Sequence, residues 1–235
     1  MRNELLAYLN KFTITVLIFL LIQFLLSSLM AFRESVPLLD SESIKVIHYN
    51  LSAALFSGIP ISILVASSRE FSTGFVSIQL LNGVQKTAFL LAKIRFSVLL
   101  SIIFTLLYII LLGSLHLFFG SRLDTVFYVK LTVLTFSVSL AINCMVSLLA
   151  LIFTDWRISV MGYLGYSFLE SLFVYSFSKS IPFLNLLPLN TLVTEFQFEQ
   201  GLNKLPNRIA GWLILIFFIM LLYRLSIIRI RKYEL

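Results

Sequence analysis

The stretch that decides the fold is FSVLLSIIFTLLYIILLGSLHLFFGS, residues 96–121, which carries no lysine, arginine, aspartate or glutamate between Arg95 and Arg122. A helix needs about 20 mostly apolar residues to cross the roughly 30 Å of hydrocarbon in a bilayer. The stretch meets that length, and we predict that it forms a transmembrane helix over about residues 96–118.

Five further apolar runs lie on either side of this stretch. They predict spans at about residues 12–32, 46–68, 131–154, 158–178 and 209–228. The last run is the weakest, because its uncharged part is short and reaches spanning length only if Arg224 extends its charged end toward the interface. The sequence therefore predicts an all-α integral membrane protein with six transmembrane helices in a single domain, residues 1–235.

The composition supports this class. Apolar residues make up 59% of the chain and charged residues 12%, whereas soluble domains carry about 25% charged residues. The net charge of +7 does not point to nucleic acid, because the basic residues stand in short clusters between the apolar runs. We expect lipid, and no nucleic acid, to surround the spans.

The distribution of lysine and arginine in the short loops predicts the orientation, because cytosolic loops carry the excess. With the N-terminus inside, eleven basic residues lie on the cytosolic side: Arg2, Lys11, Arg69, Lys86, Lys93, Arg95, Arg157, Arg224, Arg229, Arg231 and Lys232. Seven lie outside: Arg33, Lys45, Arg122, Lys130, Lys179, Lys204 and Arg208. We predict that both termini are cytosolic.

The connection between the second and third predicted spans has the pattern of a separate helix at about residues 68–82. Ser67-Ser68-Arg69-Glu70 matches a capping box, and Asn82-Gly83 suits a helix stop. Between them, Phe71, Gly74, Phe75, Ile78 and Leu81 recur at three- and four-residue steps. The alternative is that the second span runs on past the bilayer, but that leaves the capping residues at both ends without a role. An apolar stripe outside the membrane is typical of a partner surface.

Residues 69–93, REFSTGFVSIQLLNGVQKTAFLLAK, resemble the loop between spans two and three in permeases of the ABC-2 type, the membrane subunits of a group of ABC transporters. The positions that carry the resemblance are Glu70, Gly74, Leu81, Gly83, Lys86 and Lys93. The six-span layout and Leu187-Pro188-Leu189-Asn190 after the fifth span agree with it. Gln85 departs from the pattern, since many relatives carry serine or threonine there.

The resemblance implies a coupling helix that docks on a separate ABC ATPase subunit. The docking residues would be Glu70, Phe71, Gly74, Phe75, Ile78, Leu81, Gly83 and Lys86. This chain has no Gly-x-x-x-x-Gly-Lys-Ser/Thr loop, so we expect it to be no enzyme and to bind no cofactor, with ATP and magnesium in the partner. A second permease copy or a similar chain, a place in the cell (inner) membrane and export of a hydrophobic or amphipathic substrate are further implications.

Two more segments have membrane-interface patterns. Residues 2–12 place most of their apolar side chains on one helical side, which indicates an N-terminal interfacial helix or, equally, a frayed terminus. Residues 181–196 are too apolar for a free loop, while Pro182 and Pro188 interrupt any regular span. We predict a short re-entrant or interfacial segment there.

Glu170 is the one acidic residue inside a predicted span. Ionisable groups in the membrane are costly and mark functional sites, so Glu170, Asn143 and Pro188 are candidates for a translocation path or gate. The alternative is a protonated Glu170 bonded to a neighbouring helix, for instance near Asn143. An intramembrane enzyme and a stand-alone carrier are the other function classes, and the spans show neither paired catalytic residues nor inverted repeats.

Smaller features have structural interpretations. Gly58 before Pro60, and the pair Gly162 and Gly165, suit either a hinge or close helix packing, of which we expect packing. The two histidines, His48 and His116, stand far apart in the sequence, and we expect no metal site at either.

Overall fold

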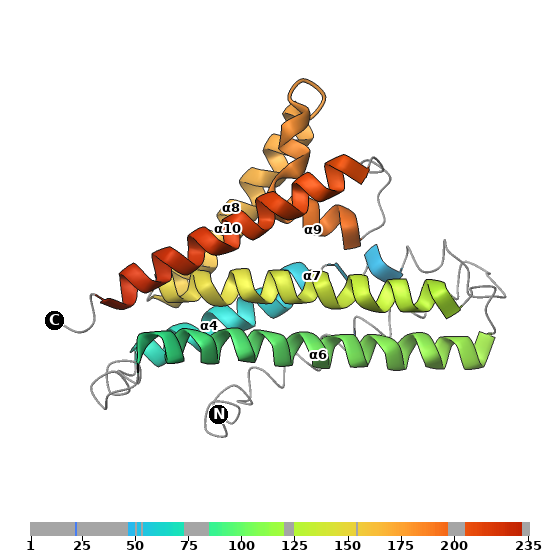
Figure 1. Ribbon diagram of the computed structural model, residues 1–235, viewed down its shortest axis with the longest axis horizontal. Helices are drawn as coiled ribbons and strands as arrows, with labels where there is room; N and C mark the ends of the chain where they lie inside the picture. The colour runs from blue at the N-terminus through green and yellow to red at the C-terminus, as the bar shows by residue number, and fades with distance from the viewer. Residues whose placement is uncertain are drawn as a thin grey trace.

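The computed structural model describes residues 22, 47–49, 51, 52, 54–72, 85–119, 125–153, 155–196 and 205–231. Every element in this part of the chain is helical, which confirms the all-α prediction (Figure 1). The elements are η1 (Ala54–Gly58), α4 (Ile59–Ser72), α6 (Lys86–Phe119), α7 (Thr125–Ile152), α8 (Trp156–Phe177), η2 (Pro182–Leu186), α9 (Pro188–Phe196) and α10 (Leu205–Arg231). The predicted interfacial helix at 2–12 lies outside the described residues.

Three of the described helices are long and apolar enough to cross a membrane: residues 87–117 of α6, 125–152 of α7 and 208–230 of α10. They correspond to the predicted third, fourth and sixth spans, so a membrane protein is confirmed in this coarse sense. The sixth run, the weakest by sequence, is a full-length helix. Of the predicted first span, only Ile22 belongs to the described residues.

Helix α7 is the central element. It contacts α4, α6, α8, α9 and α10. In the most apolar stretch of α7, 67% is buried inside the protein, compared with 39% in α6 and 22% in α10. Figure 1 shows α6 and α7 running side by side, with α10 crossing α7 obliquely. The other helices are therefore held together largely through their contacts with α7.

Helix ends differ from the predicted spans in one consistent way. Helix α6 begins at Lys86, ten residues before Phe96, and α7 begins at Thr125 rather than at 131. Apolar runs mark the lipid-crossing part of a helix, whereas the backbone ladder continues past it wherever packing supports it. Lys93 shows this, since it is buried within α6 with its ammonium 5.4 Å from the centre of the Phe89 ring.

The second predicted span is also helical in the described residues, but it is not regular. A π-helical turn, η1, precedes Pro60, and α4 then runs without a break through Ser67-Ser68-Arg69-Glu70 to Ser72. The prediction that a capping box starts a new helix at Ser67 or Ser68 is therefore wrong. Serine and glutamate at this spacing also occur inside a helix whose ladder already pairs their amides.

Residues 181–196 are ordered as two short helices, each beginning at a proline: η2 at Pro182 and α9 at Pro188. Proline suits a first helical position, because its missing amide has no partner there. Both helices contact α8 and α10, and α9 also contacts α7. In Figure 1 the segment descends beside α8 toward α7 after the turn at the top of the view.

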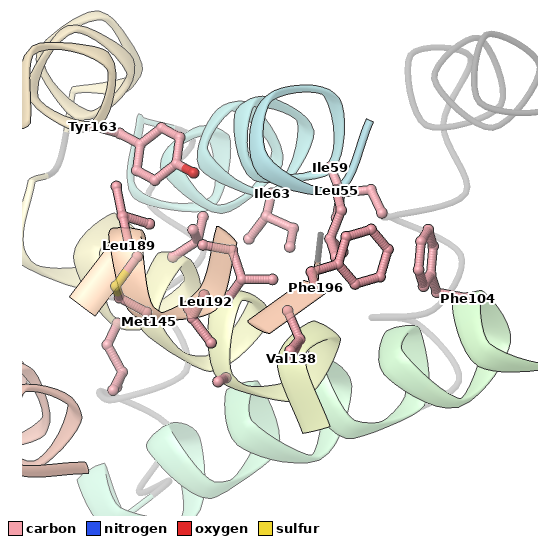
Figure 2. Packing of buried hydrophobic residues seen from close by; sticks show 14 of the residues in the cluster. Leu55, Ile59, Ile63, Phe104, Val138, Met145, Tyr163, Leu189, Leu192 and Phe196 are labelled. Carbon is pink, nitrogen blue, oxygen red and sulfur yellow. The ribbon is translucent and has the colours of Figure 1, made fainter. Parts of the chain in front are cut away.

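The apolar core gathers side chains from η1, α4, α6, α7, α8 and α9 (Figure 2). It gathers side chains that are all less than one-tenth exposed, among them Leu55, Ile59, Ile63, Phe104, Val138, Met145, Tyr163, Leu189, Leu192 and Phe196. By contrast, large apolar side chains on α6, α8 and α10 are exposed, for example Ile110, Phe168 and Phe217. Exposed apolar surface of this extent belongs in lipid or against a partner.

Candidate functional site

Of the eight residues predicted to dock an ATPase, the structure describes three, and they belong to the helices on either side of the connection. Glu70 and Phe71 belong to the last turns of α4, and Lys86 is the first residue of α6. Gly74, Phe75, Ile78, Leu81 and Gly83 lie outside the described residues. The structure therefore gives the ends of this segment and the helices that carry it.

The structure brings Glu170 together with the start of α9, two residues after Pro188. Oε1 of Glu170 accepts a hydrogen bond of 2.5 Å from the backbone N–H of Asn190. The first amides of a helix have no partner within the helix, and a carboxylate placed there also interacts favourably with the helix dipole. Glu170, only 4% exposed, thus caps α9 from the side of α8.

This geometry decides which neighbour Glu170 has. Its bonded helix is α9, not the part of α7 that carries Asn143, the neighbour suggested by sequence. Asn190 adds a second bond, from its Nδ2 to the carbonyl of Asn185 in η2 at 2.9 Å. The sequence signal for the contact is Pro188 itself, because proline marks the helix start that needs a cap.

Asn143 belongs to a different site, a polar seam between α6 and α7. Its Nδ2 donates to Oγ of Ser101 at 2.9 Å and to Oγ of Ser139 at 3.3 Å. Oγ of Ser97 donates to the backbone carbonyl oxygen of Asn143 at 3.2 Å and pairs with Oγ of Ser147 at 2.8 Å. Small polar residues let two helices approach closely and hydrogen-bond across the contact.

Sequence reasoning missed this seam, although its signal is visible in the spacing. Buried polar residues recur at every fourth position on both helices: Lys93, Ser97, Ser101 and Thr105 on α6, and Thr135, Ser139, Asn143 and Ser147 on α7. A four-residue step keeps side chains on one helical face. The seam therefore fixes the register of α6 against α7.

His48 is a second buried polar contact that sequence reasoning did not find. Its Nδ1 lies 2.7 Å from the carbonyl oxygen of Phe196, at the end of α9, and its Nε2 hydrogen-bonds the hydroxyl of Tyr108 on α6. The His48 side chain is fully buried and Tyr108 is 1% exposed. The imidazole thus joins the start of the predicted second span to α6 and α9.

Two contacts fix α9 against α10. Nε of Arg208 donates to Oε1 of Glu195 at 2.7 Å, and Nη2 of Arg208 pairs with Oε2, so the ion pair is bidentate. Close by in the sequence, a Cβ atom added at Gly211 would stand 2.9 Å from both Cγ2 and Oγ1 of Thr191. Only a glycine lets α10 approach α9 this closely without a shift.

The glycines predicted to pack helices closely behave differently. A Cβ added at Gly58 or Gly165 would meet no atom of the described residues within 4 Å, and one added at Gly162 would make ordinary contact with Phe153 at 3.8 Å. Among the described residues, Gly58 and Gly165 therefore make no close contact with a neighbouring helix.

The chain matches no protein-family model, no curated protein and no solved structure. The likeness of residues 69–93 to permeases of the ABC-2 type remains a prediction from sequence.

The chemistry of the described side chains is that of helix packing. Among them, no three histidine, cysteine, aspartate or glutamate residues lie close enough to hold a metal ion. Ser97 and Asn143 of the seam, His48 and Glu170 each form a hydrogen bond to another helix, as buried polar groups in a membrane protein require. These hydrogen bonds join α6 to α7, α8 to α9, and His48 to both α6 and α9.

Proposed function

We propose that this chain is the permease subunit of an ATP-driven transporter of the ABC-2 type. A separate ABC ATPase subunit would bind ATP and magnesium, and the permease would act as a dimer with itself or with a similar chain. We expect it to export a hydrophobic or amphipathic substrate such as a peptide, an antibiotic or a lipid-like compound. The observation that carries the proposal is the apolar segment of residues 69–93, with its resemblance to a coupling helix.

The placement of the flanking helices supports this function. Helix α4 leads into the segment and α6 leaves it, and both pack against α7. A rigid-body push on the segment would therefore act on helices that share one central neighbour. Packed helices transmit such motions as units because close-packed interfaces do not deform continuously.

Co-purification tests the docking segment. The full-length tagged chain would be co-expressed with any ABC ATPase that an adjacent reading frame encodes, and extracted in mild detergent. Phe75→Asp places a charge on the predicted apolar stripe, and we expect at least a tenfold loss of bound ATPase. Ser77→Asp is the matched control, because it adds the same charge off the stripe. Equal retention of the ATPase by both variants would contradict the docking role.

The cell-membrane location and orientation have their own test. In a Cys144→Ser background, Gln85→Cys should be protected from a membrane-impermeant maleimide in intact cells, while Ser180→Cys should react. Both native side chains are exposed in the structure. Labelling of Gln85→Cys from outside would place the docking segment on the wrong side. Substrate transport by the chain without any ATPase would favour a stand-alone carrier, and turnover of a substrate bond would favour an intramembrane enzyme.

A further inference from the structure

The helical residues of the predicted second span, here called the second helical run, are irregular at Pro60. Proline has no amide hydrogen, and its ring crowds the carbonyl four residues earlier, which here belongs to Phe56. In this run the π-helical turn η1, Ala54–Gly58, lies directly before α4. Such turns occur singly inside helices and mark places where the ladder is weakened.

A side chain from another helix donates a hydrogen bond to the Phe56 carbonyl, to which Pro60 has no amide hydrogen to donate. The hydroxyl of Tyr163 on α8 donates a hydrogen bond of 2.6 Å to the carbonyl oxygen of Phe56. Tyr163 is 2% exposed, so water does not compete strongly for this bond. Figure 2 shows the Tyr163 ring reaching from α8 toward the blue helical run.

The residues around this point differ in how closely they pack. Leu55 and Ile59 are buried in the core, whereas a Cβ added at Gly58 would meet no atom of the described residues within 4 Å, so the missing side chain of Gly58 serves the backbone rather than one of these neighbours. The flanks, by contrast, are anchored: His48 on one side bonds Tyr108 and the Phe196 carbonyl. On the other side Ile63 and Leu64 are buried. The point where Pro60 interrupts the backbone hydrogen bonds therefore lies between two held segments.

We propose that residues 54–60 form a bending point in the second helical run, and that the Tyr163 hydroxyl is the latch that holds it in the arrangement seen here. Tyr163 acts on the backbone carbonyl of Phe56, so it is a positioning residue. The bending point and its latch involve only residues of this chain and need no partner protein. What drives it rests on the proposed function, in which a push on the segment after α4 would swing α4 about this point.

Spin-label distances on the full-length chain in lipid nanodiscs test the latch. One label is placed at Ser72→Cys, the last residue of α4, and one at Leu91→Cys on α6, in a Cys144→Ser background. Twelve residues of helix beyond Pro60 make an arm of about 18 Å, and a bend of about 20° moves its tip by roughly 6 Å. We expect Tyr163→Phe to shift or broaden the distance distribution on this scale.

Two further variants separate a latch from general damage. Tyr175→Phe removes a hydroxyl from the same helix at a side chain that is 92% exposed, and should leave the distribution as in the native chain. Pro60→Ala restores an amide that can bond the Phe56 carbonyl, so it should narrow the distribution and abolish the effect of Tyr163→Phe.

The proposal is overturned if Pro60→Ala leaves the width of the spin-label distance distribution unchanged. It is also overturned if Tyr163→Phe shifts that distance equally in the chain with Pro60 and in the Pro60→Ala chain. Should Tyr163→Phe fail to fold, the Pro60→Ala comparison decides by itself. No ATPase is present in these measurements, so their failure is distinguishable from a failure of the docking experiment.

Discussion

Oε1 of Glu170 on α8 accepts the backbone N–H of Asn190 at 2.5 Å, so an acidic side chain of one helix caps the start of another. The contact places the carboxylate beside Pro188, the residue that opens α9. It explains how an ionisable residue persists in a mostly apolar helix, because the amide ends of α9 offset part of the cost of its burial.

Substitutions at Glu170 distinguish capping from a role that needs its charge. Glu170→Ala removes the acceptor, and we expect it to lower the free energy of unfolding by about 1–2 kcal/mol, as loss of a helix cap does. Glu170→Gln keeps an oxygen at the same place and should cost less than half of that. Thermal unfolding in detergent measures both. If Glu170→Gln abolishes transport while its melting temperature stays native, the charge has a function beyond the cap.

The ion pair between α9 and α10 predicts that losing one partner lowers stability more than losing both. Arg208→Gln leaves the Glu195 carboxylate, whose side chain is 3% exposed, without its bidentate partner. We expect a loss of about 1–3 kcal/mol in unfolding free energy. Pairing it with Glu195→Gln should recover part of the loss, because no buried charge then remains. Lys130→Gln, on the exposed surface of α7, serves as the control. An equal loss in the single and double variants would mean that the charges are not coupled.

Gly211 should not tolerate even alanine. The added Cβ would stand 2.9 Å from two atoms of Thr191, so α10 and α9 must separate. Crowding of this kind costs about 1–3 kcal/mol. Thr191→Ala in the same chain removes both atoms and should restore the melting temperature. Gly113→Ala is the matched control in a helix where an added Cβ meets nothing within 4 Å. A melting temperature in Gly211→Ala at or above that of Gly113→Ala would contradict the close approach.

The polar seam predicts that chemistry matters more than size at Asn143. Asn143→Ala loses the donors to Ser101 and Ser139 and should cost about 1 kcal/mol, the usual scale for hydrogen bonds between membrane helices. Asn143→Asp has nearly the same shape but brings a carboxyl group into the seam, and should cost at least about 2 kcal/mol. Ser137→Ala, whose native hydroxyl bonds the Val133 carbonyl within α7, is the control. An Asn143→Asp chain as stable as Asn143→Ala would refute this account.

The apolar runs predicted the existence of α6, α7 and α10, because long uncharged apolar stretches are stable as helices in lipid and costly to expose to water. The same signal missed the helix starts at Lys86 and Thr125, since it measures contact with lipid rather than backbone pairing. The prediction of a helix start from the capping motif at Ser67–Glu70 was wrong for a related reason. Local residue chemistry cannot tell a helix start from a helix interior when the preceding residues are already helical.

The contacts of the site were harder to predict than the helices. Glu170 was singled out by its charge, but its partner is a backbone amide, which every residue except proline supplies. His48 and Tyr108 pair across 60 residues of sequence, and neither carries a pattern that points to the other. The seam on α6 and α7 is the exception. Its four-residue repeat of serine, threonine and asparagine is visible in the sequence, but a search for apolar length passes over it.

The position of α7 has a consequence for how the chain is made. Helices α6 and α7 precede α8, α9 and α10 in the sequence, so they leave the ribosome first, and the seam gives these two helices hydrogen bonds that need no later partner. They can leave the translocation machinery as a finished hairpin. The helices that follow in the sequence, α8, α9 and α10, then pack on a pair that has already formed, so a wrong register between α6 and α7 would also displace the contacts of these later helices.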